Sequence, residues 1–236
     1  MAFKSTTDIT AVFPAFVMHK QWDTPEGFNE RLYELAVDDA VKNRPTDEGN
    51  ETNIGQTDMH FSHLRHNFIL DYKDHPEIQD LVRMTEDACR EYLMAVYGYE
   101  HKGDMLMESD TFWQRRSERE NLGIYNHTHP QSDLVVVYYP KVVLDDDAGI
   151  EEIGALRVYD PGNVGKRFWD TNNEGFFVGG WFQVEPKTGS MVVLEGYVPH
   201  DSTYFAGDER MCIPIQVDVQ TPKKHVKVNT KFVTGG

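Results

Sequence analysis

The chain has few of the features that mark secreted, membrane-bound or disulfide-rich proteins. It contains two cysteines, Cys89 and Cys212, in unrelated segments, which predicts neither a disulfide framework nor a cysteine-rich zinc site. No stretch approaches the roughly 18 apolar residues of a membrane helix. The N-terminal run AVFPAFVM is short and interrupted by Pro14, so it is a poor signal peptide. We therefore expect reduced thiols, a cytoplasmic location and no membrane partner.

Basic residues are scarce relative to acidic ones. There are 23 Lys and Arg against 39 Asp and Glu, which gives a formal net charge of −16. Binding to a nucleic-acid backbone depends on clusters of Lys and Arg, so we expect no nucleic-acid partner. The simplest interpretation of the charge is solubility. The hydrophobic fraction of 39% and the aromatic fraction of 12% are sufficient for a packed core.

The first hundred residues contain two helical patterns. Residues 23–43 predict a helix with Asp23 or Thr24 as its N-cap and a proline in its first turn. Residues 74–98 predict a longer helix that Asp74 caps and a terminal glycine ends. Both patterns place apolar side chains on one stripe, so we expect these helices to pack against the rest of the fold.

From about residue 105 the pattern changes to strand-length runs separated by turn signals such as DDDAG, DPGN and EPKTG. Many short strands with regular turns are typical of a sandwich or barrel. We predict a mainly β fold, a jelly-roll core with flanking α-helices from the N-terminal part. One domain is expected over residues 1–236, with a strand and supporting helices in 1–104, the jelly roll in 105–220 and a peripheral tail in 221–236.

The segment NLGIYNHTHPQSDLVVVYY contains the most informative pattern. His127 and His129 lie two residues apart, and such residues share one face of an extended strand. His200 ends a second strand-like run, and Arg210 opens another strand ten residues later. Three imidazoles fit either a zinc site or a non-haem iron site. A fixed guanidinium favours an organic acid that chelates the metal at one end and pairs with Arg210 at the other.

This ordered set resembles the 2-oxoglutarate and Fe(II)-dependent oxygenase superfamily, whose pattern is H-x-D, a distant H, and R-x-S about ten residues later. Within that superfamily, the chain more closely resembles a group of oxygenases from bacteria and their viruses. The matching features are Val12-Phe13-Pro14, Trp113, the H-x-H-P segment His127–Pro130, the run VVVYY, Gly154-Ala155-Leu156 and the run GSMVVL. They cover nearly the whole chain. The resemblance implies a double-stranded β-helix, which is the jelly roll expected above.

The resemblance also implies Fe(II), 2-oxoglutarate as co-substrate, and O2. The reaction would oxidatively decarboxylate 2-oxoglutarate and hydroxylate a small molecule or a protein side chain. No catalytic residue is expected beyond the metal ligands, and the oligomeric state stays open. The expected ligands are His127, His129 and His200. The expected co-substrate residues are Arg210, Tyr125, Tyr139 and Cys212, and the candidate substrate contacts are Arg157 and Trp113.

The chain departs from the family pattern at the second ligand position. His129 stands where the family has a carboxylate. Either His129 is a third nitrogen ligand, or only His127 and His200 bind the metal and a water or carboxylate completes the site. Asp133 and Asp201 are the carboxylates nearest in sequence.

A second departure is Cys212, which stands where the family has a serine and is a weaker hydrogen-bond partner.

Two other functions are consistent with the residues. One is a cupin-like three-histidine metalloprotein that does not use 2-oxoglutarate. The other is a non-catalytic jelly-roll binding module.

Overall fold

Strands dominate the part of the chain that the computed structural model describes, which comprises residues 4–12, 15–42, 59–61, 67–115, 126–149, 151–161 and 181–220. The helices in these ranges are α1 (Phe28–Lys42), α2 (Phe68–Asp71) and α3 (Pro76–Tyr97), and none of them is long and apolar enough to cross a membrane. The strands are β1 (Lys4–Val12), β2 (Ala15–Asp23), β3 (Met59–Phe61), β4 (Met105–Ser109), β5 (Phe112–Arg115), β6 (Leu134–Val143), β7 (Leu156–Tyr159), β8 (Trp181–Val184), β9 (Ser190–Glu195), β10 (His200–Ser202) and β11 (Glu209–Val219).

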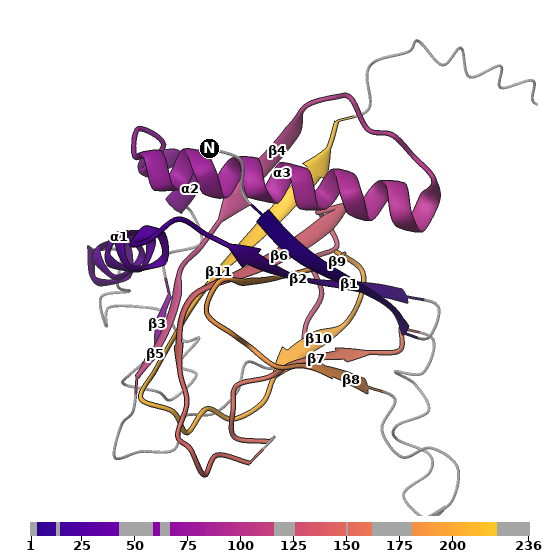
Figure 1. Ribbon diagram of the computed structural model, residues 1–236. Coiled ribbons are helices and arrows are strands. Elements are labelled where there is room, and N and C mark those ends of the chain that lie inside the picture. The colour runs from indigo at the N-terminus through magenta and orange to yellow at the C-terminus, as the bar shows by residue number, and fades with distance from the viewer. Residues whose placement is uncertain are drawn as a thin grey trace, which may run out of the picture.

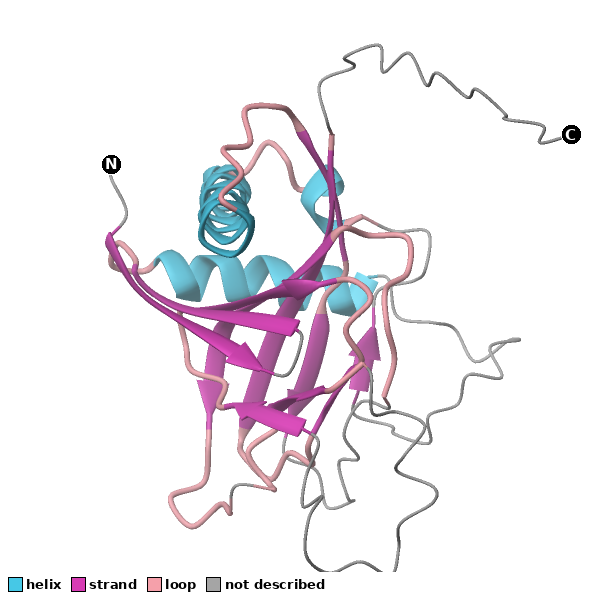
Figure 2. Ribbon diagram, turned by 90° about the vertical axis from the view of Figure 1, so that its right-hand side faces the viewer, coloured by secondary structure: helices cyan, strands magenta, loops and turns pink. Residues whose placement is uncertain are grey.

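These strands form two antiparallel sheets. In the described residues the large sheet has eight strands in the order β1-β2-β9-β6-β11-β5-β3, with β4 also paired to β11, and the small sheet has the order β10-β7-β8. The large sheet lies between the helices and the small sheet (Figure 1). A view turned by 90° shows the helices gathered on one side of it (Figure 2). The predicted mainly β jelly roll with flanking helices is confirmed.

Both faces of the large sheet are buried, and each face has its own core. Along β6, Val136 and Tyr138 belong to the core beneath the helices, whereas Val137 and Tyr139 belong to the inner core between the two sheets. The side chains of a strand alternate between its faces. A strand buried on both faces therefore appears in sequence as the continuous apolar run LVVVYY.

Helix α3 begins one residue later than the sequence predicts. His75, not Asp74, is its N-cap, and no side chain caps it; Pro76 occupies the first helical position. Proline suits this position because it lacks the N–H that a cap would satisfy. Gly98 ends the helix in the left-handed conformation as predicted, with φ of 62°. Cys89 is fully buried on the sheet-facing side of the helix.

Helix α1 also begins later than predicted, at Phe28. Neither Asp23 nor Thr24 caps it. Gly27 has φ of +75°, outside the right-handed helical region, so the preceding residues form a separate turn. In that turn the backbone N–H of Phe28 donates to the carbonyl of Pro25 at 3.0 Å.

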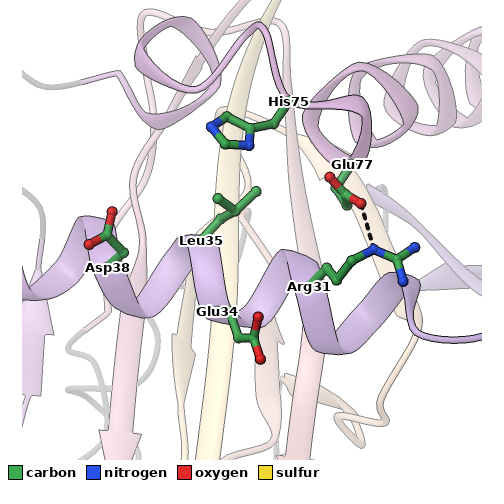
Figure 3. A pocket seen from close by; sticks show the side chains of 6 residues that line it. All are labelled: Arg31, Glu34, Leu35, Asp38, His75 and Glu77. Carbon is green, nitrogen blue, oxygen red and sulfur yellow. Dashed lines mark hydrogen bonds and ion pairs between the residues drawn. The ribbon is translucent and has the colours of Figure 1, made fainter.

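A surface hollow lies between α1 and the start of α3 (Figure 3). Across it, Nε of Arg31 donates to Oε1 of Glu77 at 2.6 Å. The hollow is on the helix side of the large sheet, which is the face opposite the inner core. Its lining residues are Arg31, Glu34, Leu35, Asp38, His75 and Glu77.

Candidate metal and co-substrate site

Three histidines converge between the two sheets. His127 and His200 lie opposite each other and exchange both backbone N–H···O bonds at 3.0 Å, and residues paired in this way project their side chains to the same face. The N–H of His129 donates to the carbonyl of Gly196 at 2.7 Å. The ring centroids are 4.4 to 5.2 Å apart, and the ligand atoms lie within 4.8 Å of one another.

The segment around His127 is not the strand that the sequence predicts. The residues from 126 to 133 form no strand, and their one β-bridge is the isolated pairing of His127 with His200. The histidines are therefore brought together by this long-range bridge as well as by their spacing.

The chemistry of these imidazoles fits a divalent transition metal. Nδ1 of His200 lies 2.9 Å from the carbonyl oxygen of Val198, and since a carbonyl only accepts, Nδ1 carries the proton and Nε2 keeps its lone pair. Burial and the nearby His127 lower the pKa of His200 to about 3. The same two causes, burial first, lower the pKa of His129 to about 4. Both rings are neutral at pH 7, as metal ligation requires.

Gln216 on β11 orients His129. It hydrogen-bonds the imidazole, which partly opposes the lowering of its pKa. The hydroxyl of Ser132 donates to Oε1 of Gln216 at 3.1 Å. Partners of this kind fix the orientation of a metal-ligating ring.

The two carboxylates considered as completing ligands are engaged elsewhere. Asp201 accepts from Nε and Nη2 of Arg157 at 2.7 and 3.0 Å and from the hydroxyl of Tyr159 at 2.6 Å. Asp133 is exposed and accepts from the backbone N–H of Val219 at 2.7 Å. Within the described ranges, the group able to hold a metal consists of His127, His129 and His200.

Arg210 on β11 is buried, with 1% of its surface exposed. Its Nη1 donates to the carbonyl oxygen of Gly154, and its guanidinium lies over the rings of Phe112 and Tyr139, 5.7 and 6.0 Å from their centroids. Its Nε has no hydrogen-bond partner in the described part of the chain. A buried charged group that keeps an unpaired donor is costly, so the site suits an anion that enters from the inner space.

Gly154 is required for this arrangement. Its φ of +65° is unfavourable for residues other than glycine. A Cβ there would also fall well inside van der Waals contact with Nη1 of Arg210. The sequence signal was present, because Gly154 belongs to the quoted run Gly154-Ala155-Leu156, but its role depends on the fold.

Two other predicted co-substrate residues lie beside Arg210. Tyr139 is buried in the inner core, and burial raises the pKa of its hydroxyl. Cys212 is buried on the same face, hydrogen-bonds Arg210, and has a pKa raised by burial. Tyr125 lies outside the described residues.

Strand β7 and the residues just before it connect the histidine cluster to Arg210. His200 pairs with Val158 of β7, and Val158 faces the inner core, so His200 does as well. Arg210 contacts Gly154, four residues before Val158. Four residues span at most about 14 Å. His200 and the guanidinium of Arg210 therefore lie on the inner-core side of the sheets, held by segments only four residues apart along the chain.

The two candidate substrate residues lie away from this space. Arg157 alternates with Val158 on β7, so it faces outward, where it pairs with Asp201 and lies 3.6 Å from Glu151. Trp113 alternates with Phe112 on β5 and packs in the core beneath the helices, donating to Oε1 of Glu209 at 2.9 Å. The structure brings neither residue to the histidines.

Sequence reasoning missed four residues that lie next to the histidines or Arg210. Phe112 and Gln114 reach the inner face through strand alternation and the pairing of β5 with β11, and Gln216 reaches it where β11 pairs with β4 and β6. The fourth, Val198, supplies the carbonyl that orients His200. None of them carries a local motif, so pairing between distant segments was the missing information.

Comparison with known proteins identifies the fold. No family model and no curated protein matches the chain. EvdO2 from Micromonospora carbonacea var. aurantiaca is 11% identical with a TM-score of 0.55, covering 86% of each chain. The alpha ketoglutarate dependent carbocyclase SnoK is 14% identical with a TM-score of 0.53, covering 85% of this chain and 78% of that one.

A prolyl-4-hydroxylase from Pseudomonas putida is 16% identical with a TM-score of 0.50, covering 86% of this chain and 92% of that one. At these identities the likeness concerns the fold. The chain has the fold of the 2-oxoglutarate and Fe(II)-dependent oxygenases, as the sequence resemblance implied.

Proposed function

We propose that this protein is an Fe(II)- and 2-oxoglutarate-dependent oxygenase that hydroxylates a small molecule or a protein side chain. One observation carries the proposal: in the described residues, the buried Arg210 keeps an Nε without a hydrogen-bond partner, and three histidines cluster between the same two sheets. A metal ion would account for the histidine cluster, and an organic-acid co-substrate bound to that metal would account for the unused donor of Arg210. The fold neighbours include a prolyl-4-hydroxylase and a carbocyclase from nogalamycin biosynthesis, which supports either type of substrate.

In this proposal His127, His129 and His200 hold the metal. When bound, Fe(II) supplies oxygen activation coupled to the decarboxylation of 2-oxoglutarate. The contribution of the protein is to keep His129 and His200 neutral by burial and to orient them through Gln216 and the Val198 carbonyl.

Arg210 receives the far carboxylate of the co-substrate. Nη1 is held by Gly154, and the rings of Phe112 and Tyr139 flank the guanidinium, so the charge is oriented before the ligand arrives. Charge-assisted hydrogen bonds in a buried setting are strong. The apolar inner core around these residues excludes water from the pair.

A second candidate is a three-histidine metalloenzyme that does not use 2-oxoglutarate. The absence of a carboxylate from the metal-capable group in the described residues favours it. The unpartnered Nε of Arg210 disfavours it, because such an enzyme has no need of a buried anion-binding arginine.

An anaerobic binding experiment separates the two candidates. Fe(II) and 2-oxoglutarate are added to the purified protein, and the visible charge-transfer band of the metal chelate is recorded. The proposal predicts a band that Arg210→Ala weakens and that the surface variant Arg31→Ala leaves unchanged. Bound iron without a band, and no effect of Arg210→Ala on any ligand, would favour the second candidate.

A further inference from the structure

Gln114 on β5 is a buried amide whose nitrogen and oxygen find no hydrogen-bond partner in the described part of the chain. Its side chain is fully buried, and neither Nε2 nor Oε1 has a hydrogen-bond partner among the described residues. An unpaired buried polar group lowers the stability of a fold, and native proteins keep few of them. Such a group is expected where a bound ligand accepts a hydrogen bond from its Nε2 donor.

The register of β5 on β11 places this amide beside Arg210. Gln114 pairs with Arg210, and Phe112 pairs with Cys212. Phe112 and Cys212 belong to the inner core, and residues two apart on a strand share a face. Gln114 and Arg210 are therefore neighbours on the inner face of the large sheet.

Each of these two neighbours keeps an unused donor. Nε of Arg210 and Nε2 of Gln114 are both buried without a partner in the part of the chain that is described. One carboxylate offers two oxygens, enough to accept from both donors. A hydroxyl or a carbonyl offers a single oxygen and no charge to match the guanidinium.

We propose that Gln114 binds the far carboxylate of the organic-acid co-substrate together with Arg210. It supplies the contact for which Cys212, a weak hydrogen-bond partner, is poorly suited. This inference rests on the proposed function, since it adds a residue to the same co-substrate site. It predicts that Gln114 contributes to the selectivity for a dicarboxylate over a monocarboxylate.

The test measures co-substrate binding with a redox-inert metal, so that no turnover is needed. The protein is loaded with Mn(II), and the Kd values of 2-oxoglutarate and of 2-oxobutanoate, which lacks the far carboxylate, are measured by calorimetry. The variants are Gln114→Met, which is similar in size and has no amide, and Arg210→Ala. Gln79→Met is the control, because Gln79 is exposed at the start of α3 and donates to the Lys73 carbonyl.

Gln114→Met is expected to raise the Kd of 2-oxoglutarate about 10-fold or more, the size of a lost hydrogen bond to a charged group. The Kd values of Mn(II) and 2-oxobutanoate are expected to stay at wild-type level. The Tm of the ligand-free variant is expected to rise, because an unsatisfied buried amide has been removed. A purely structural glutamine would give the opposite sign of the Tm change and would shift all three Kd values together.

Two results would overturn the inference about Gln114, and only the second would also overturn the proposed function. If Gln114→Met leaves 2-oxoglutarate binding unchanged while Arg210→Ala weakens it, Gln114 is not a co-substrate residue and the proposed function stands. If the Mn(II)-loaded wild-type protein does not bind 2-oxoglutarate at all, the proposed function and this inference both fail.

Discussion

The carbonyl oxygen of Gly154 accepts a hydrogen bond from Nη1 of Arg210, and the same guanidinium fills the space where a side chain at position 154 would lie. The glycine and the arginine are 56 residues apart in sequence. Their contact joins β11 of the large sheet to the segment just before β7 of the small sheet, so it fixes Arg210 relative to His200, which pairs with β7.

Gly154→Ala is therefore expected to displace Arg210. The new Cβ would collide with the guanidinium, and an alanine would also be strained at this positive φ. We therefore expect the unfolding free energy to fall by about 2 kcal/mol. We also expect 2-oxoglutarate to bind more weakly. Gly98→Ala is a matched control, because Gly98 has φ of +62° and a Cβ added there would meet no atom within 4 Å. It should lose stability through the backbone alone and keep co-substrate affinity. Equal co-substrate affinity in both variants, measured by calorimetry, would contradict this role of Gly154.

His129→Ala tests whether His129 is a ligand. We expect the affinity for Mn(II) to fall at least about 10-fold, since even residues that only orient a ligand have effects of that size. His129→Asp restores the carboxylate of the family pattern and is expected to recover metal binding. His75→Ala, at the exposed start of α3, is the control. Wild-type metal affinity in His129→Ala would assign the site to two histidines.

Asp201→Asn tests the alternative that a carboxylate completes the metal site. Because Asp201 is held by Arg157 and Tyr159, we expect metal affinity to be unchanged and the unfolding free energy to fall by on the order of 2 kcal/mol, the size of a lost hydrogen bond to a charged group. The pair of measurements is Mn(II) titration and urea denaturation. The opposite pattern, lost metal with intact stability, would make Asp201 a ligand.

The metal-free protein is expected to lose stability in mild acid. Folding lowers the pKa of His200 to about 3 and that of His129 to about 4, from an unfolded value near 6.5. Below about pH 6.5 the unfolded chain therefore binds up to two more protons than the folded one, and the unfolding free energy falls as the pH falls toward 4. Above pH 7 the two groups add no pH dependence.

Urea denaturation with a chelator present, between pH 7.5 and pH 5, measures this loss. The double variant His129→Asn, His200→Asn lacks both titrating groups and should show a shallower pH dependence than the wild type. Parallel curves for the two proteins would show that other groups dominate the acid sensitivity.

The sequence predicted the fold better than it predicted the faces of individual strands. The run LVVVYY and the turn signals after residue 105 were sufficient for the jelly roll. The placement of Trp113 could not be predicted, because both faces of β5 are buried and alternation alone does not say which core each side chain enters. Gln114 was missed for the same reason, since its relation to Arg210 depends on the register between β5 and β11.

The histidines illustrate the same limit. Their spacing predicted a shared face for His127 and His129, but His127 lies outside any strand and meets His200 through a single bridge. Local rules also failed at the two helix starts. A positive φ at Gly27 and the proline at the first position of α3 delayed each helix beyond the predicted cap.

A crystal structure of the protein with Mn(II) and 2-oxoglutarate tests the proposed site most directly. We expect one metal ion within about 2.0–2.3 Å of a nitrogen of His127, His129 and His200. The far carboxylate of the ligand should lie within hydrogen-bond distance of Arg210. A metal bound elsewhere, or a ligand whose far carboxylate does not contact Arg210, would contradict the proposed function.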